Sequence, residues 1–357
     1  MSHQVLSGCV NYKRKVGAIY VFNRRTFLAS AGIALLAPVA RAELLDAARK
    51  EGTLTWYIAQ IDSEAAEPVA RRFTAEHPGI AVAAVRTTGQ VAYQRLLLEL
   101  KNQAPQCDVF STTDISQMPA LKERNALLRY EPPNAAGLLP MFQALSDPGW
   151  YYANSATNHF LVYNKNKVPA AEAPRRWTDL LDTRWKNQIA LPHPAFSGCG
   201  GVWALGVRKL YGWSFFEKLA KNNPRIGRSF NDPVTLIAAG EAMVGPGPAN
   251  STFPAMDKGN PLDIVYPEDG CSLCVAPSAI PATAPHPNAA RLFLDWMLGD
   301  VYSQMSIDRG SEALRPNLMP KPGRKRVEDL SVLPLSVAEI RGGVPEVIEQ
   351  WRDTFGS

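Results

Sequence analysis

The chain has 357 residues, of which 46% are hydrophobic and 20% are charged, and its formal net charge is +5. The first 42 residues hold six of the 38 basic residues and none of the 33 acidic ones, so the remaining 315 are nearly neutral. The charge balance of this nearly neutral part gives no reason to expect nucleic acid or an anionic membrane as a partner, and its length suffices for two domains.

Residues 1–42 are interpreted as an export signal. The pair Arg24-Arg25 stands before an apolar run from Phe27 to Val39, and Ala40 and Ala42 form an A-x-A exit. Twin arginines predict the Tat route, with cleavage after about Ala42 and a periplasmic location. The apolar run is shorter than the roughly 20 residues that span a bilayer, although a retained anchor is the alternative.

A second export motif near the start is interpreted as accidental. Leu6-Ser7-Gly8-Cys9 has the spelling of a lipoprotein box, but no apolar segment precedes it. The stretch before Asn23 is consistent with a start codon assigned too early.

Four cysteines follow the predicted signal: Cys107, Cys199, Cys271 and Cys274. Cys271 and Cys274 are predicted to be able to form a disulfide in an oxidising compartment. A redox C-x-x-C is the alternative, but this one lies in an apolar, strand-like run and does not open a helix.

Strands and helices alternate along the first part of the mature chain. This pattern predicts a mostly parallel sheet flanked by helices, hence an α/β fold. Strands are predicted at 53–59, 80–85 and 107–111, with helices at 63–77 and 91–102.

The second part repeats the pattern after an extended segment at 150–164. Its predicted strands lie at 188–191, near Ser229, and at 243–245, 262–266 and 272–279; its predicted helices lie at 200–211, 215–222, 233–239 and 288–298. The sequence therefore predicts a second α/β block.

Several short stretches, in this order and spacing, resemble the bacterial extracellular solute-binding proteins of family 1, in the branch that contains ferric-iron-binding proteins. They are 106–110 (QCDVF), 160–165 (FLVYNK), 177–182 (WTDLLD), 191–194 (LPHP) with Ser197-Gly198, 266–270 (YPEDG) and 284–290 (APHPNAA). The resemblance implies a type II periplasmic binding fold with two lobes and two extended hinge crossings. It places lobe one at 43–155 plus 270–357, lobe two at 160–266, and hinges near 156–160 and 266–270.

The family's function is to bind a solute in the cleft and deliver it to the permease of an ABC importer, which implies hinge closure around the ligand. The expected partners are a small solute and this permease. No nucleic acid, cofactor, metal or enzymatic activity is expected, and the chain is expected to be a monomer.

Candidate ligand-binding residues begin with a glycine-rich turn before a predicted helix. Glycines allow close backbone approach, and a helix start presents unpaired N–H groups suited to phosphonate, phosphate or carboxylate oxygens. The alternative is an ordinary serine cap in a tight turn. Polar loops after the strands are expected to complete the cleft. The full set is Ser197, Gly198, Cys199, Gly200, Gln60, Thr88, Gly89, Gln90, Thr112, Thr113, Asn231, Asn250 and Ser251.

The expected ligand class depends on two positions at which the resemblance to ferric-iron-binding proteins implies adjacent, iron-binding tyrosines. The matching residues, Asn250 and Ser251, are neutral and cannot neutralise Fe³⁺, which disfavours iron held directly. Iron in a chelate and a polyamine remain alternatives. An anionic or polar solute is preferred, with Arg86 and Arg315 as candidate counter-charges.

An enzyme is the remaining alternative. Cys199 follows a glycine-rich turn and His193 is near in sequence, which mimics a nucleophile and a base. No third orienting group is identifiable, so this interpretation ranks below transport.

Overall fold

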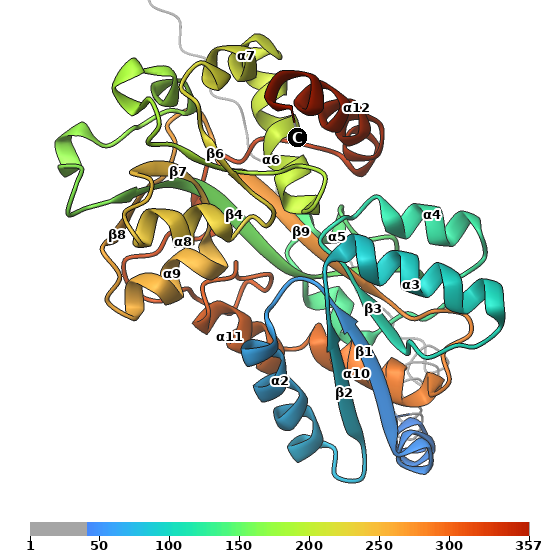
Figure 1. The fold of residues 1–357 in the computed structure, drawn as a ribbon. Helices are drawn as coiled ribbons and strands as arrows, with labels where there is room; N and C mark the ends of the chain where they lie inside the picture. Colours follow the sequence, from blue (N-terminus) through green and yellow to red (C-terminus); the bar gives the residue numbers. More distant parts are fainter. Residues whose placement is uncertain (1–40, 357) are drawn as a thin grey trace, which may run out of the picture. The chain divides into compact units, whose positions relative to one another are not determined.

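Three parallel strands form the first part of the sheet, as the alternating pattern predicts. They are β1 (Thr53–Ile58), β2 (Ala81–Arg86) and β3 (Val109–Ser111), and β1 lies between the other two. The connections are helices α2 (Ser63–Glu76) and α3 (Gly89–Asn102), and the two crossovers place β2 and β3 on opposite sides of β1 in the same sheet. The computed structural model describes residues 41–356 (Figure 1).

Residues from Leu44 onward form a unit separate from Met1–Glu43, and the description concerns that unit. The predicted export signal, with its twin arginines, lipoprotein-like box and cleavage site, lies almost entirely outside the described residues. Among residues 41–356, no helix combines the length and apolar character needed to cross a bilayer.

Two long antiparallel strands connect the two blocks. Strand β4 (Tyr152–Asn164) pairs with β9 (Ser272–Ala279) along its first part, and with β7 (Val244–Pro248) and β8 (Leu262–Val265) along its second. The strand order is β2-β1-β3-β9-β4-β7, with β8 also on β4. The large sheet is therefore mixed and not mostly parallel as expected, because the crossing strands enter it antiparallel. Figure 1 shows β4 and β9 running from one block to the other.

The second block is built around a short parallel pair, β5 (Ala190–Pro192) and β6 (Arg225–Gly227), which adjoins β7 through an Ile189–Val244 bridge. The helices of this block are α6 (Gly198–Tyr211), α7 (Ser214–Ala220), α8 (Asp232–Ala238) and α9 (Ala249–Asp257).

The remaining helices complete the packing around the sheet. They are α4 (Gln117–Glu123), α5 (Pro140–Gln143), α10 (Pro287–Met297), α11 (Asp300–Asp308) and α12 (Val337–Phe355). Short 3-10 turns lie at Pro133–Gly137, Ala170–Glu172, Trp177–Leu181, Thr183–Trp185 and Val327–Asp329.

Large aromatic residues fill the core on both sides of the crossing strands. Trp56 of β1 meets Phe293 of α10 edge to face at 5.2 Å, and Trp203 of α6 meets Trp177 at 5.9 Å. Trp56 and Trp203 are fully buried, so both belong to the core.

The C-terminal helix α12 packs on α6 and α7 of the second block. Trp351 contacts Phe216 at 5.6 Å, and Trp213 Nε1 donates to Thr354 Oγ1 at 2.9 Å. The sequence had grouped this region with the first block, as part of 270–357. Its apolar stripe instead covers α6, next to which Figure 1 places it.

The disulfide joins Cys199 and Cys274, whose Cα atoms are 5.2 Å apart, while Cys107 and Cys271 are free and buried. The Cys271–Cys274 bridge that the sequence allowed is not formed. Residues three apart along an extended segment point to opposite faces, so Cys274 faces α6 and Cys271 faces away from it. The bridge ties the start of α6 to the crossing strand β9.

Candidate functional site

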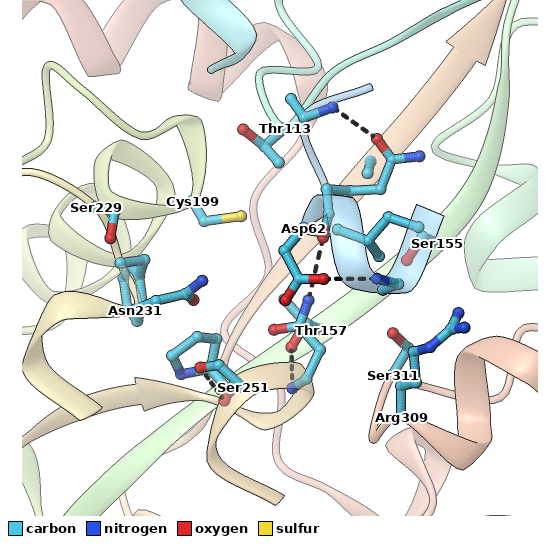
Figure 2. Close-up of a pocket in the computed structure, with 18 of the residues that line it drawn as sticks. Asp62, Thr113, Ser155, Thr157, Cys199, Ser229, Asn231, Ser251, Arg309 and Ser311 are labelled. Carbon is cyan, nitrogen blue, oxygen red and sulfur yellow. Dashed lines mark hydrogen bonds between the residues drawn. The ribbon is translucent and has the colours of Figure 1, made fainter. Parts of the chain in front are cut away.

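A cavity of about 580 Å³ lies against both blocks and the two crossing strands. Loops that follow β1, β2 and β3 line it from the first block, and the starts of α6 and α9 line it from the second. Ser155 and Thr157 of β4, with Cys274 and Ala276 of β9, also line it. Figure 2 shows Thr113, Ser155, Cys199 and Ser251 converging on the cavity from separate elements. The volume is that of a small-molecule site.

Most of the predicted binding residues lie on this cavity. The lining includes Gln60, Thr88, Gly89, Thr113, Ser197, Cys199, Asn231, Asn250 and Ser251. Predicted binding residues that are distant in sequence therefore lie around one cavity, next to the crossing strands β4 and β9.

Four predicted residues, Gly198, Gly200, Gln90 and Thr112, are not part of the cavity lining. Thr112 is buried and its hydroxyl donates to Gln117 Oε1 at 2.8 Å. Gly200 N–H donates to Ser197 Oγ at 3.4 Å, which is the serine cap that the sequence left as an alternative.

Gly198 permits a close approach between protein segments rather than toward a ligand. A Cβ on this residue would lie 2.3 Å from the carbonyl oxygen of Thr113, well inside contact distance. The start of α6 is therefore packed directly against the loop after β3, and only glycine fits there.

We expect Gly198→Ala to destabilise the fold by about 1–3 kcal/mol, the usual effect of forcing an extra methyl into a packed site. Gly342→Ala is the matched control, because its Cβ would meet nothing within 4 Å on helix α12. There alanine is expected to be neutral or to stabilise by up to about 1 kcal/mol. Urea unfolding of both variants measures this difference, and equal stabilities would contradict the tight contact.

The two blocks also contact each other through Asn250 at the start of α9. Its Nδ2 donates to the backbone oxygen of Gln60 at 3.4 Å, and its backbone N–H donates to Thr157 Oγ1 at 3.3 Å. Asn250 therefore joins the loop after β1 to the crossing strand β4.

Charged side chains of both signs line the cavity. The acidic ones are Asp62 and Glu64, and Asp62 caps α2 by accepting from the Ala65 N–H at 2.7 Å. The basic ones are Arg86, Lys258 and Arg309. Arg86, a predicted counter-charge, is thus on the cavity, although it is exposed.

Arg315, the other predicted counter-charge, lies elsewhere. It forms an ion pair with Asp300 and donates to the carbonyl oxygens of Asn134 (3.1 Å) and Leu298 (2.8 Å). Its role is to connect surface segments, so the prediction for this residue is wrong.

Sequence reasoning missed several polar residues of the cavity, among them Ser155, Thr157, Ser229, Ser306, Arg309 and Ser311. Ser155 and Thr157 belong to a strand whose every residue is buried, and Arg309 and Ser311 follow a short helix near the C-terminus. The one available signal was the run of Asn, Ser and Thr at 154–158, which is unusually polar for a buried strand.

Two buried titratable groups adjoin the crossing strand β4. Burial lowers the pKa of His159 to about 3, and its ring stacks on Phe230 of the cavity wall at 4.1 Å. Burial raises the pKa of Glu312 to about 7, opposed by hydrogen bonds from the N–H and Nδ2 of Asn158. His159 is therefore neutral, and Glu312 titrates near neutral pH.

The cavity offers no set of hard ligands for a metal within the described residues. Its lining contains no tyrosine or histidine, and no cluster of three or more His, Cys, Asp or Glu side chains in residues 41–356 could hold an ion. Cys199, the candidate nucleophile, is bonded to Cys274, so it has no thiolate to act as a nucleophile.

Comparison with known proteins agrees with this geometry. The family model of bacterial extracellular solute-binding proteins matches residues 104–329, more than half of the chain. A putative 2-aminoethylphosphonate-binding periplasmic protein of Salmonella paratyphi A is 27% identical over 222 residues, covering 61% of this chain and 60% of that protein. The chain spans between 37% and 64% of the length of the curated relatives it matches.

Two solved structures share the fold. The periplasmic binding protein AfuA from Actinobacillus pleuropneumoniae, with fructose-6-phosphate bound, has a TM-score of 0.76; iron-bound HitA from Pseudomonas aeruginosa has 0.72. Each is 21% identical and covers 85% of this chain and 99% of its own. The fold is thus that of the type II periplasmic binding proteins, as predicted. With the family match, the chain belongs to the bacterial extracellular solute-binding proteins.

Proposed function

We propose that this chain is the periplasmic receptor of an ABC importer, and that it binds a small anionic or polar solute in the cavity between two lobes. The observation that carries the proposal is the cavity itself, about 580 Å³ in volume and lined from both blocks and both crossing strands. Neither block alone provides a complete binding surface, so a ligand that contacts both favours their closed arrangement.

The lobes of this proposal follow the strands. Lobe one holds β1, β2, β3 and the helices on them, and lobe two holds β5 to β8 with α6 to α9. Strands β4 and β9 serve as the hinge. The expected hinge at 156–160 lies within β4, whereas β9 begins just after the expected hinge at 266–270. Helix α12 moves with lobe two, because it is packed on α6 and α7.

The polar lining supports an organic anion as the ligand class. Among its polar side chains, hydroxyl and amide groups predominate, and the starts of α3 and α9 lie at the cavity, where their N–H groups favour negative charge. A phosphonate, a phosphate ester or a carboxylate fits this environment. The relative named for 2-aminoethylphosphonate and the neighbour holding fructose-6-phosphate point to the same class.

The competing functions have less support in the described residues. Iron bound directly lacks phenolate ligands on the cavity wall, and a cysteine enzyme lacks a free thiol at Cys199. A polyamine would find Asp62 and Glu64, but both are exposed and three basic residues share the cavity with them.

The proposal is tested by thermal unfolding of the purified chain with 2-aminoethylphosphonate, fructose 6-phosphate, putrescine and ferric citrate. A ligand at 100 times its dissociation constant should add about 2.7 kcal/mol of stability. Stabilisation by an anion, together with a smaller radius of gyration in scattering, is the expected result. Stabilisation by putrescine or ferric citrate alone would move the function to those classes. No response to any compound would contradict the proposed ligand class.

A further inference from the structure

One end of the cavity carries a positive charge and two hydroxyl groups that have no partner in the protein. Arg309 lines the cavity and is partly buried, and its guanidinium makes neither an ion pair nor a hydrogen bond with any residue in 41–356. Ser155 and Ser311 line the same cavity with relative exposures of 4% and 6%. Their hydroxyl groups form no hydrogen bond within the described part of the chain. Figure 2 shows all three on one side of the cavity, opposite Ser229 and Asn231.

The backbone holds these residues beside one another. Glu312 N–H donates to the carbonyl oxygen of Ala156 at 2.8 Å, which fastens the segment after α11 to strand β4 next to Ser155. Ser311 N–H donates to Ser306 O at 3.0 Å and closes the end of α11. Gly310, at φ +93°, makes the turn between Arg309 and Ser311 possible.

These unpaired groups are available to a ligand. Both hydroxyls and the guanidinium face the cavity, so a ligand that enters it can form hydrogen bonds with all three without displacing a protein partner. A group with several negatively charged oxygens accepts hydrogen bonds from both hydroxyls and from the planar guanidinium at the same time. A neutral or cationic ligand group leaves the charge of Arg309 unmatched.

The start of α6 offers less to an anion than its sequence suggests. Gly198 is packed against the Thr113 carbonyl oxygen and the Gly200 N–H is taken by Ser197. Of the other basic residues on the cavity, Arg86 and Lys258 are both exposed. Arg309 is therefore the basic residue of the cavity whose charge is partly shielded from water.

We propose that Arg309, Ser155 and Ser311 form an oxyanion subsite that binds the phosphonate, phosphate or carboxylate group of the solute. This subsite rests on the proposed function, and it specifies the end of the cavity that binds the charged group of the solute. The rest of the solute then extends toward Ser229 and Asn231, where neutral polar groups suit hydroxyls or an amine.

The test is calorimetric titration of the unmodified chain and of Arg309→Gln, with 2-aminoethylphosphonate, fructose 6-phosphate and inorganic phosphate as probes. For each anion that the unmodified chain binds, Arg309→Gln is expected to raise the dissociation constant by about 10- to 100-fold. Loss of a charge-assisted hydrogen bond has an effect of this size. Arg309→Lys should recover part of that loss, and Ser155→Ala with Ser311→Ala should weaken binding by about 10-fold. Arg124→Gln, which removes the same charge from an exposed position outside the cavity, should bind like the unmodified chain.

The outcomes separate the two proposals. If the unmodified chain binds an anion and Arg309→Gln binds it equally well, with an unchanged unfolding temperature, the subsite is overturned while the receptor function stands. If the chain binds none of the three anions, the ligand class of the proposed function fails and the subsite fails with it. If putrescine, titrated in the same way as a fourth probe, binds and Arg309→Gln binds it more tightly, the cavity recognises cations and the subsite is refuted.

Discussion

Loss of the Cys199–Cys274 disulfide is expected to lower the free energy of unfolding by about 4.5 kcal/mol. The bridge closes a loop with a sequence separation of 75 residues. The chain-entropy relation for a loop of that length gives the figure, because the open chain gains conformations mainly in the unfolded state. Denaturant unfolding of Cys199→Ala with Cys274→Ala, compared with the oxidised chain, measures the loss.

The matched control is Cys271→Ala, which removes a buried free thiol three residues from Cys274 and leaves the bridge intact. Its expected effect is much smaller than that of the double variant. Peptide mapping of the oxidised chain under non-reducing conditions should find residues 199 and 274 in one linked fragment. A linked fragment with Cys271 and Cys274 joined would contradict the pairing.

The same bridge has a consequence for binding. Both of its cysteines line the cavity, and it ties the start of α6 to strand β9, a proposed hinge element. In the double variant, α6 remains packed on both α12 and β9, but it is no longer covalently linked to β9. We therefore expect weaker ligand binding in that variant even under conditions where it is fully folded.

The second large effect expected is a loss of stability as the pH rises through neutrality, caused by Glu312. Burial raises the pKa of this carboxyl from 4.5 to about 7, so the folded chain binds the proton more tightly than the unfolded chain. The stabilising contribution of the neutral form is fully present below pH 4.5 and is lost as the pH rises through about 7. The linkage relation makes the change about 3 kcal/mol over that window.

Glu312→Gln tests this effect, because the amide keeps an oxygen for the Asn158 N–H and cannot ionise. The variant is expected to lose the decline between pH 4.5 and 8 and to exceed the unmodified chain by about 3 kcal/mol at pH 8. Glu349→Gln, a change at an exposed position, should keep the original profile. A Glu312→Gln profile parallel to the original would assign the pH dependence to other groups.

Glu312 also couples the hinge to the proposed subsite. Its carboxylate accepts from Asn158 of β4, and its backbone N–H holds the segment that carries Arg309 and Ser311. The variant therefore reports on two properties, and its ligand affinity should be measured at the same pH values as its stability.

Regular elements were the most predictable part of this protein. The predicted strand at 53–59 and helix at 63–77 appear as β1 and α2, and the extended segment at 150–164 appears as β4. Each has a strong local pattern bounded by glycine, proline or a capping residue, and such patterns depend on neighbours only a few residues away.

The run at 244–248 (VGPGP) was predicted as a strand only in part, at 243–245. Glycine and proline normally mark loops, yet this run forms strand β7 beside β4. A Cβ on Gly247 would lie 2.3 Å from the side chain of Val162, so the neighbouring strand requires glycine there. The helix that follows, α9, was not predicted, although Asn250 and Ser251 in its first turn were.

The sequence by itself determined the alternation of strands and helices, the family, and most of the polar residues around the cavity, because these depend on short motifs and on the residues that follow strands. Only the tertiary structure decided that Cys199 pairs with Cys274, that α12 packs on α6, and that Arg309 joins Ser155 at the cavity. Those partners are from about 75 to about 150 residues apart in sequence. Their meeting depends on how the crossing strands bring the two blocks together, which no local pattern encodes.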